Sequence, residues 1–276
     1  MNKLSTEERR RVVACLVEGN SLCATTRMTG VHRTTVMKLL NDLGAACQAF
    51  QDVTLRKLNA KVVQCDEIWS FVGCKEKNAT VAKEIEGQGD CWTWVGMDAE
   101  SKLVCAWLVG SRDADSAAEF MNDLASRLAH RVQLTTDGHR AYLTAVEDAF
   151  GREIDYAMLV KQYGNAPNTP AGRYSPAECT GIKKVSITGA PDKSLVSTSY
   201  IERQNLTMRM SMRRFTRLTN AFSKKIENHM AAISLHYMHY NFARIHQSLR
   251  VTPSMAAGLS DHVWSLEGII ALLGDK

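Results

Sequence analysis

The sequence predicts an α/β protein with a mixed five-stranded sheet flanked by helices, preceded by a small all-α domain. Two observations lead to this fold class. Residues 1–60 show helical periodicity interrupted by glycines, whereas from residue 61 runs of β-branched and aromatic residues alternate with amphipathic segments. At 276 residues, 45% of them apolar, the chain can bury a substantial core and accommodate one large and one small domain.

Three short helices are predicted in residues 1–45. Their ranges are 5–18, 21–28 and 31–43. The first begins with Ser5 and Glu8 in capping-box spacing, and Gly44 is predicted to end the third. This succession is typical of a helix-turn-helix domain, although small three-helix units with other uses exist. Residues 46–60 are predicted to form a linker helix.

The third helix separates apolar from polar side chains. Its buried face is predicted to hold Val36, Leu39, Leu40 and Leu43. The side chains left for the grooves and phosphates of double-stranded DNA are those of Arg33, Thr34, Thr35 and Lys38.

An RNase H-like domain is predicted over residues 61–260. Its first three strands form an antiparallel meander at 62–72, 91–98 and 103–109. A helix, a strand, a second helix and a fifth strand follow at 115–130, 132–136, 141–150 and 154–160. This order of elements is that of the RNase H-like fold, in which the first strand is central and the fourth lies beside it.

The rest of the chain is predicted to be a loop followed by helices. Residues 163–199 are rich in Gly, Pro, Ser, Thr and Asn, which predicts a long loop or insertion. Helices are expected at 200–218 and 223–240, with a small one from Thr252 and a helical tail at 261–276.

Composition excludes several classes of protein. No stretch approaches the roughly 18 uninterrupted apolar residues of a membrane span, and the N-terminus lacks the apolar core of a signal peptide. We therefore expect a cytoplasmic protein with no membrane partner. The 8 cysteines include no Cys-x-x-Cys pair, which argues against a zinc ribbon or a disulfide framework.

Positive charge is concentrated in two segments. Residues 1–60 carry nine Lys/Arg against five Asp/Glu, and residues 202–225 carry seven against one, although the net charge of the chain is only +5. Two basic segments on an otherwise acidic chain favour a polyanionic partner such as DNA. The plainer interpretation is that both are solvated helix faces.

Three acidic residues occupy positions suited to metal binding. Asp66 ends an apolar run of the first strand, Asp137 follows the fourth strand, and Glu202 lies at the start of a helix. Carboxylates are the hard oxygen ligands that Mg²⁺ prefers, and two such ions can drive phosphodiester chemistry. Each acid alone is a weak signal, because an Asp after a strand is more often a turn former or helix cap.

The helix that carries Glu202 has a second chemical feature. One face holds residues at i, i+3, i+7 and i+11, namely Glu202, Asn205, Arg209 and Arg213. An adjacent apolar stripe can pack on the sheet. A carboxylate followed by an amide and two cations favours a nucleic-acid backbone running past the metals.

Together these residues resemble the DDE transposases of insertion sequences, most closely the IS1-type group. The motifs that carry the resemblance are Asp66-Glu-Ile-Trp-Ser-Phe-Val72, Trp92-Thr-Trp-Val-Gly-Met-Asp98, Ala106-Trp-Leu-Val-Gly-Ser-Arg112, Thr136-Asp-Gly-His-Arg-Ala-Tyr142 and Ile201-Glu-Arg-Gln-Asn205. The C-terminal segments 240–246 and 252–255 are also similar, so the resemblance covers nearly the whole chain.

The resemblance implies Mg²⁺-dependent cleavage at insertion-sequence ends and transfer of the freed 3′ hydroxyl to target DNA. It implies Asp66, Asp137 and Glu202 as catalytic, metal-binding residues for two Mg²⁺ ions, with Mn²⁺ as a substitute. The DNA-binding residues would be those of the third helix together with Tyr142, Lys161, Asn205, Arg209, Arg213, Arg214 and His246. A homodimer or larger assembly on DNA, associated with the nucleoid, is also implied.

Two departures and two alternatives accompany this interpretation. The group often has Cys-x-x-Cys pairs ahead of the helix-turn-helix and an aromatic where this chain has His139. One alternative is a transposase-derived DNA-binding regulator without cleavage activity. The other is an RNase H-superfamily nuclease that cuts without joining.

Overall fold

The computed structural model describes residues 4–81, 87–164, 179–216 and 220–274. The chain begins with three helices, α1 (Thr6–Val17), α2 (Leu22–Thr29) and α3 (Arg33–Thr54). Ser5 and Glu8 form the predicted capping box on α1, and Gly30 ends α2 in the left-handed conformation. The predicted division of α3 into buried apolar and exposed polar residues is confirmed.

Helix α3 does not end at Gly44 as predicted but continues to Thr54 without a break. Gly44 instead allows α3 to lie close to α8 (Ile226–Met238): a β-carbon at this position would come within 2.5 Å of the Ala231 backbone. Next to it, the Ser234 hydroxyl donates to the Gly44 carbonyl over 2.8 Å. The glycine therefore serves helix packing, and the predicted linker helix is in part a continuation of α3.

Replacing Gly44 by Ala should destabilise the protein by about 1–3 kcal/mol, because the added methyl group collides with backbone rather than with a movable side chain. Helix propensity alone would give the opposite sign. The measurement is urea unfolding of both proteins. As a control, Ala45→Gly on the exposed side of α3 should cost about 1 kcal/mol through propensity alone. A more stable Gly44→Ala variant would contradict the packing role.

The described residues form a mixed six-stranded sheet in the order β3-β2-β1-β4-β5-β6. Its strands are β1 (Val62–Val72), β2 (Gly89–Asp98), β3 (Val104–Gly110), β4 (Gln133–Thr136), β5 (Asp155–Tyr163) and β6 (Cys179–Thr188). The first three are antiparallel, whereas β1, β4 and β5 run parallel. The predicted strands, their order and the central place of β1 are confirmed, and the arrangement is consistent with an RNase H-like fold.

The sixth strand corrects two predictions, that of a five-stranded sheet and that of a loop over 163–199. Residues 179–188 pair antiparallel with β5. The strand escaped detection because it is an edge strand with most residues exposed on both faces, so no alternation of apolar and polar residues marks it. Residues 165–178 of the same predicted loop lie outside the described part of the chain.

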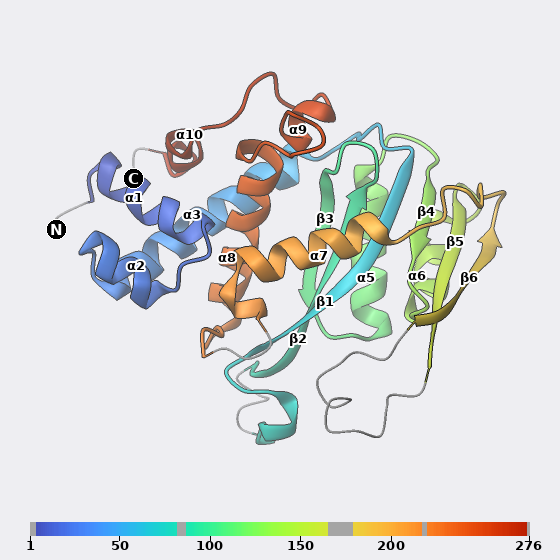
Figure 1. Cartoon of the computed structure of the whole chain (residues 1–276), viewed down its shortest axis with the longest axis horizontal. Coiled ribbons are helices and arrows are strands. Elements are labelled where there is room, and N and C mark those ends of the chain that lie inside the picture. The colour runs from blue at the N-terminus through green and yellow to red at the C-terminus, as the bar shows by residue number, and fades with distance from the viewer. Residues whose placement is uncertain (1–3, 82–86, 165–178, 217–219, 275–276) are drawn as a thin grey trace.

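Helices cover both faces of the sheet (Figure 1). On one face lie α5 (Ala114–Arg127) and α6 (Ala141–Phe150), and on the other α7 (Ser199–Ser211) crosses β1. The core continues between sheet and helices through large buried side chains such as Trp94, Phe120 and Tyr237.

The C-terminal segment closes over the first helices. A π-helical turn (His239–Ala243) follows α8, and α9 (Pro253–Ala256) and α10 (Leu266–Ala271) come after it. Helix α10 packs on α1, where Arg10 and Glu267 approach to 3.4 Å. None of the described helices is both long and apolar enough to cross a membrane.

Candidate metal centre

The site is built where the central parallel strand β4 ends. The last residue pair between β1 and β4 is Cys65 with Thr136, and Asp137 follows at once. Strand β1 continues to Val72 on one side, and β5 continues to Tyr163 on the other. Beyond Asp137 the described residues place no strand between β1 and β5. Ligands of open α/β sheets bind at such carboxyl ends of parallel strands.

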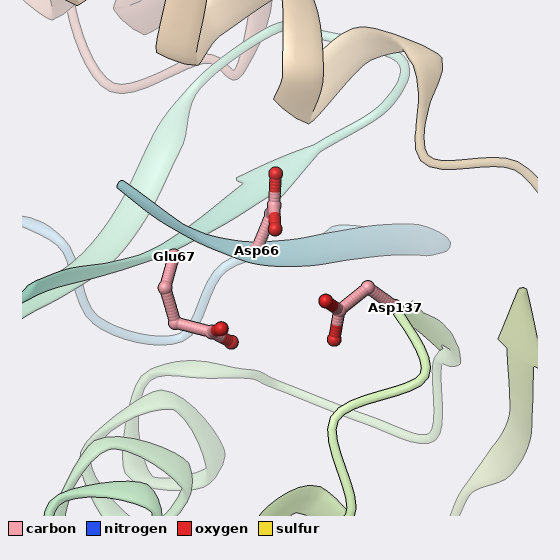
Figure 2. A group of neighbouring side chains, drawn as sticks. All are labelled: Asp66, Glu67 and Asp137. Atoms are coloured by element: carbon pink, nitrogen blue, oxygen red, sulfur yellow. The ribbon is translucent and has the colours of Figure 1, made fainter. Parts of the chain in front are cut away.

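Three carboxylates meet at this edge. Asp66, Glu67 and Asp137 each offer an oxygen, and these oxygens lie within 4.8 Å of one another. Consecutive residues of a strand point to opposite faces, and Figure 2 shows Asp66 on one side of β1 with Glu67 and Asp137 pointing toward each other on the other. Strand β4 no longer pairs with β1 at this point, so side chains on opposite sides of β1 can approach each other at its edge. Asp66 itself lies inside β1 rather than at its end.

Burial and mutual repulsion disfavour ionisation of these carboxyl groups. Burial, together with the charges of Asp137 and Glu67, raises the pKa of Asp66 to about 7. Burial also raises the pKa of Glu67, with Asp137 adding to the effect. A divalent cation would relieve this repulsion, and a set of carboxylate oxygens fits Mg²⁺ or Mn²⁺ by its chemistry. The residues present therefore fit the metal that the sequence resemblance implies.

Arg112 partly balances the negative charge of Glu67 and Asp137. The Arg112 guanidinium lies 3.0 Å from Glu67 through Nε and 3.7 Å from Asp137 through Nη2. It also lies 4.8 Å from the centre of the Trp92 ring, an arrangement that holds the cation against β2. Sequence reasoning missed both Arg112 and Glu67. Both residues belong to motifs that carry the resemblance, and the signal that could have found Glu67 is its place directly after Asp66.

Helix α7 is attached to β1 by two polar side chains. Gln64 Oε1 accepts hydrogen bonds from the backbone N–H groups of Tyr200 and Ile201, at 3.0 and 3.1 Å. One turn further, Asn205 Nδ2 donates to Asp66 Oδ2 over 2.9 Å. Asn205 thus orients Asp66 directly, and the helix brings Glu202 to the same side of β1.

Glu202 lies beside the three-carboxylate cluster without being one of its members. Its carboxylate accepts hydrogen bonds from Lys161 Nζ and from the Thr198 hydroxyl. Its negative charge contributes to the raised pKa of Asp66, so the two groups interact electrostatically. Of the predicted trio, Asp66 and Asp137 therefore lie in one cluster and Glu202 interacts with Asp66, whereas the third acid of the cluster is Glu67.

Lys161 extends the site on the β5 side. Burial lowers its pKa, but the hydrogen bond and charge of Glu202 outweigh burial, so the pKa is raised overall and the ammonium stays charged. A half-buried lysine at this point can neutralise one carboxylate or bind one phosphate.

Two predicted DNA-contacting residues are placed unfavourably by the structure. Tyr142 has no exposed surface and packs edge-on against Trp94, which leaves nothing for DNA to contact. The Arg214 guanidinium is turned inward, donating to Ser223 and to the Asn228 carbonyl, and burial lowers its pKa to about 10. Neither side chain presents its polar group to the surface in the way that the prediction assumed.

Arg213 is exposed but does not continue the predicted stripe of Glu202, Asn205 and Arg209. Helix α7 ends at Ser211 because the Met212 backbone is extended, and a 3₁₀ turn (Arg213–Phe215) follows. The i+11 relation to Glu202 therefore does not apply. The sequence pattern does not predict this helix end, since the segment contains neither Gly nor Pro.

The remaining predicted residues lie at the surface. Arg209 is exposed on α7, and Arg33, Thr34, Thr35 and Lys38 are exposed on the first turns of α3. His246 is half-buried, with Nδ1 3.1 Å from the Ser248 hydroxyl. These positions are compatible with contact to a large polyanion.

Comparison with known proteins gives little. No protein-family profile matches the sequence. No curated protein matches it either. Among solved structures, one titled "Crystal structure of the Mos1 Strand Transfer Complex" aligns with 85% of this chain and 78% of its own, at 13% identity and a TM-score of 0.25. A likeness this low carries no weight for fold or function.

Proposed function

We propose that the chain is a DNA transposase that cleaves DNA at insertion-sequence ends and joins the freed 3′ hydroxyl to target DNA, with divalent metal. The observation that carries the proposal is the gathering of Asp66 and Asp137 at the end of β4, with Glu202 brought alongside by the bond from Asn205 to Asp66. IS1-type motifs in the sequence support the same function. Two element ends must be held together, so at least two copies would act on DNA.

Asp66, Asp137 and Glu202 would hold two Mg²⁺ ions. Such ions, when bound, activate the attacking oxygen and stabilise the leaving oxygen of a phosphodiester. The protein's own groups supply orientation and charge around them. Asn205 fixes the Asp66 carboxylate, and Lys161 beside Glu202 provides a cation for a phosphate of the DNA backbone. No protein nucleophile is required.

DNA recognition would involve the start of α3. Its exposed residues are Arg33, Thr34, Thr35 and Lys38, and His32 caps the helix by accepting from the Thr34 N–H. The first turns of a recognition helix commonly face base edges in the major groove. The apolar side of α3 packs on α8, so this surface is fixed to the rest of the protein.

Arg33→Ala and Lys38→Ala should each make DNA binding by the whole chain less salt-dependent. Each lost phosphate contact should reduce the slope of log K against log salt by about 1. Fluorescence anisotropy between low and moderate salt measures the slope. Arg11→Ala, an exposed arginine of α1, is the matched control with an unchanged slope. If the α3 variants behave like this control, α3 does not contact phosphate.

A joining assay tests the proposed function. A precleaved element end is mixed with a second duplex and Mg²⁺, and the proposal expects a covalent joined product. Cleavage without joining would indicate a nuclease instead. Specific binding with neither activity would indicate a DNA-binding regulator.

A further inference from the structure

We infer that Glu67 is a metal ligand, and that the cation bound in the absence of DNA is held by Asp66, Glu67 and Asp137 rather than by a set that includes Glu202. The inference rests on the proposed function for the identity of the ion as Mg²⁺ or Mn²⁺. It assigns to the site a fourth carboxylate that the sequence did not indicate.

The first observation is that the Glu67 carboxylate is buried and only partly paired. Its side chain is only 1% exposed. One oxygen pairs with Arg112, whereas the buried Oε1 has no hydrogen-bond partner. The Tyr142 hydroxyl interacts with this carboxylate and lowers its pKa, yet it also lacks a partner at hydrogen-bonding geometry. A buried carboxylate oxygen left in this state is costly unless something binds it.

The second observation is the direction in which the Glu67 side chain points. Figure 2 shows Glu67 pointing toward Asp137 from the neighbouring strand, and an oxygen of each lies within 4.8 Å of the other and of Asp66. Strand β1 has no residue pair with β4 beyond Cys65, so no β4 partner lies beside Asp66 and Glu67. A single cation at this edge would bring Asp66 from one side and Glu67 from the other into one ligand set.

Glu202 differs from Glu67 in burial and in position. Its side chain is 40% exposed, so water reaches the carboxylate, and one oxygen, Oε1, accepts from both Lys161 and Thr198. It is not one of the three clustered acids, and a metal bound to it would lie beside the Lys161 ammonium, whose positive charge disfavours binding. A phosphate arriving with DNA would give Lys161 another partner and free Glu202 for a second ion. The two sites should therefore fill in sequence.

The experiment measures Mn²⁺ binding to the full chain without DNA. The two readouts are isothermal titration calorimetry and the electron paramagnetic resonance signal of free Mn²⁺. Glu67→Gln should weaken the first site about 10-fold or more. Glu202→Gln should leave it within about 2-fold, since this residue belongs to the later site. Glu67→Asp, which keeps the charge, should recover part of the loss.

Arg112→Gln is the decisive control. This change removes the ion pair with Glu67 but leaves the carboxylate in place. With a competing positive charge gone, the first site should bind Mn²⁺ as well as, or better than, the parent protein. Thermal unfolding without metal establishes that each variant is folded at the assay temperature.

Two results would overturn the inference: unchanged Mn²⁺ affinity in Glu67→Gln, or equal weakening in Glu67→Gln and Arg112→Gln, which would mean that Glu67 acts through Arg112. The proposed function fails separately. If Glu67→Gln loses Mn²⁺ as expected but the parent protein neither cuts nor joins DNA, the metal site stands and the transposase proposal does not.

Discussion

Replacing Asp66 by Ala should lower the rate of Mg²⁺-dependent cleavage at an element end on the order of 10³-fold. Loss of a metal-binding carboxylate removes several kcal/mol of transition-state stabilisation, and each 1.36 kcal/mol corresponds to about tenfold in rate. Affinity for the same DNA should change by less than about threefold, because the proposed recognition surface is on α3 and not at the acidic edge. A gel assay of cleavage and an anisotropy titration measure the two quantities.

Asp148→Ala serves as the matched control, since this aspartate is exposed on α6. It should cleave at the parental rate. Glu202→Gln should show a loss comparable to that of Asp66→Ala once DNA is bound. Cleavage at the parental rate in Asp66→Ala would remove the metal centre from the mechanism altogether.

Replacing Asp66 by Asn should stabilise the metal-free protein by about 2–4 kcal/mol at pH 8. The pKa of Asp66 is raised from 3.8 to about 7, so folding disfavours its ionised form. The stability linked to this group is therefore complete below the pKa of the unfolded chain, near 4, and is lost as the pH rises through about 7. Asn carries no charge to disfavour, and the gain should shrink toward zero at pH 4. Urea unfolding in the presence of a chelator measures it.

Adding Mn²⁺ provides the complementary result. The ion should stabilise the parent protein at pH 8 and should stabilise Asp66→Asn much less, because the variant has lost a charged ligand. If the Asn variant is no more stable than the parent at pH 8, burial and the neighbouring carboxylates do not disfavour the ionised form of Asp66. Stability at functional sites is often sacrificed in this manner.

The sequence predicted the architecture well where burial patterns are strong. Helices α1 to α3 follow helical periodicity, and the first five strands are marked by runs of β-branched and aromatic residues, because the central strands are buried on both faces. Asp66 and Asp137 could be paired in advance because the first and fourth strands of this fold are neighbours. The pairing of Cys65 with Thr136 places them as that reasoning requires.

What the sequence did not predict depends on tertiary contacts. A glycine after a helical run is typical of a helix end, but Gly44 lies within α3. The close approach of the Ala231 backbone explains why a glycine is present there. Strand β6 is exposed on both faces and therefore carries no pattern. Tyr142 belongs to a recognised motif, yet its role lies inside the core beside Trp94.

Glu67 illustrates the limit most clearly. Alternation along β1 directs it to the face opposite Asp66, and this is correct for the strand itself. The early end of β4 then allows both side chains to reach a common point. The length of a neighbouring strand decided the composition of the site, and single-residue patterns carry no information about it.

The most direct test of the metal centre is a crystal of the full chain soaked in Mn²⁺ and measured at the manganese absorption edge. We expect an anomalous peak with ligand oxygens from Asp66 and Asp137 at roughly 2.0–2.3 Å. A peak elsewhere on the protein, or a structure in which these two carboxylates bind no manganese at saturating concentration, would contradict the account.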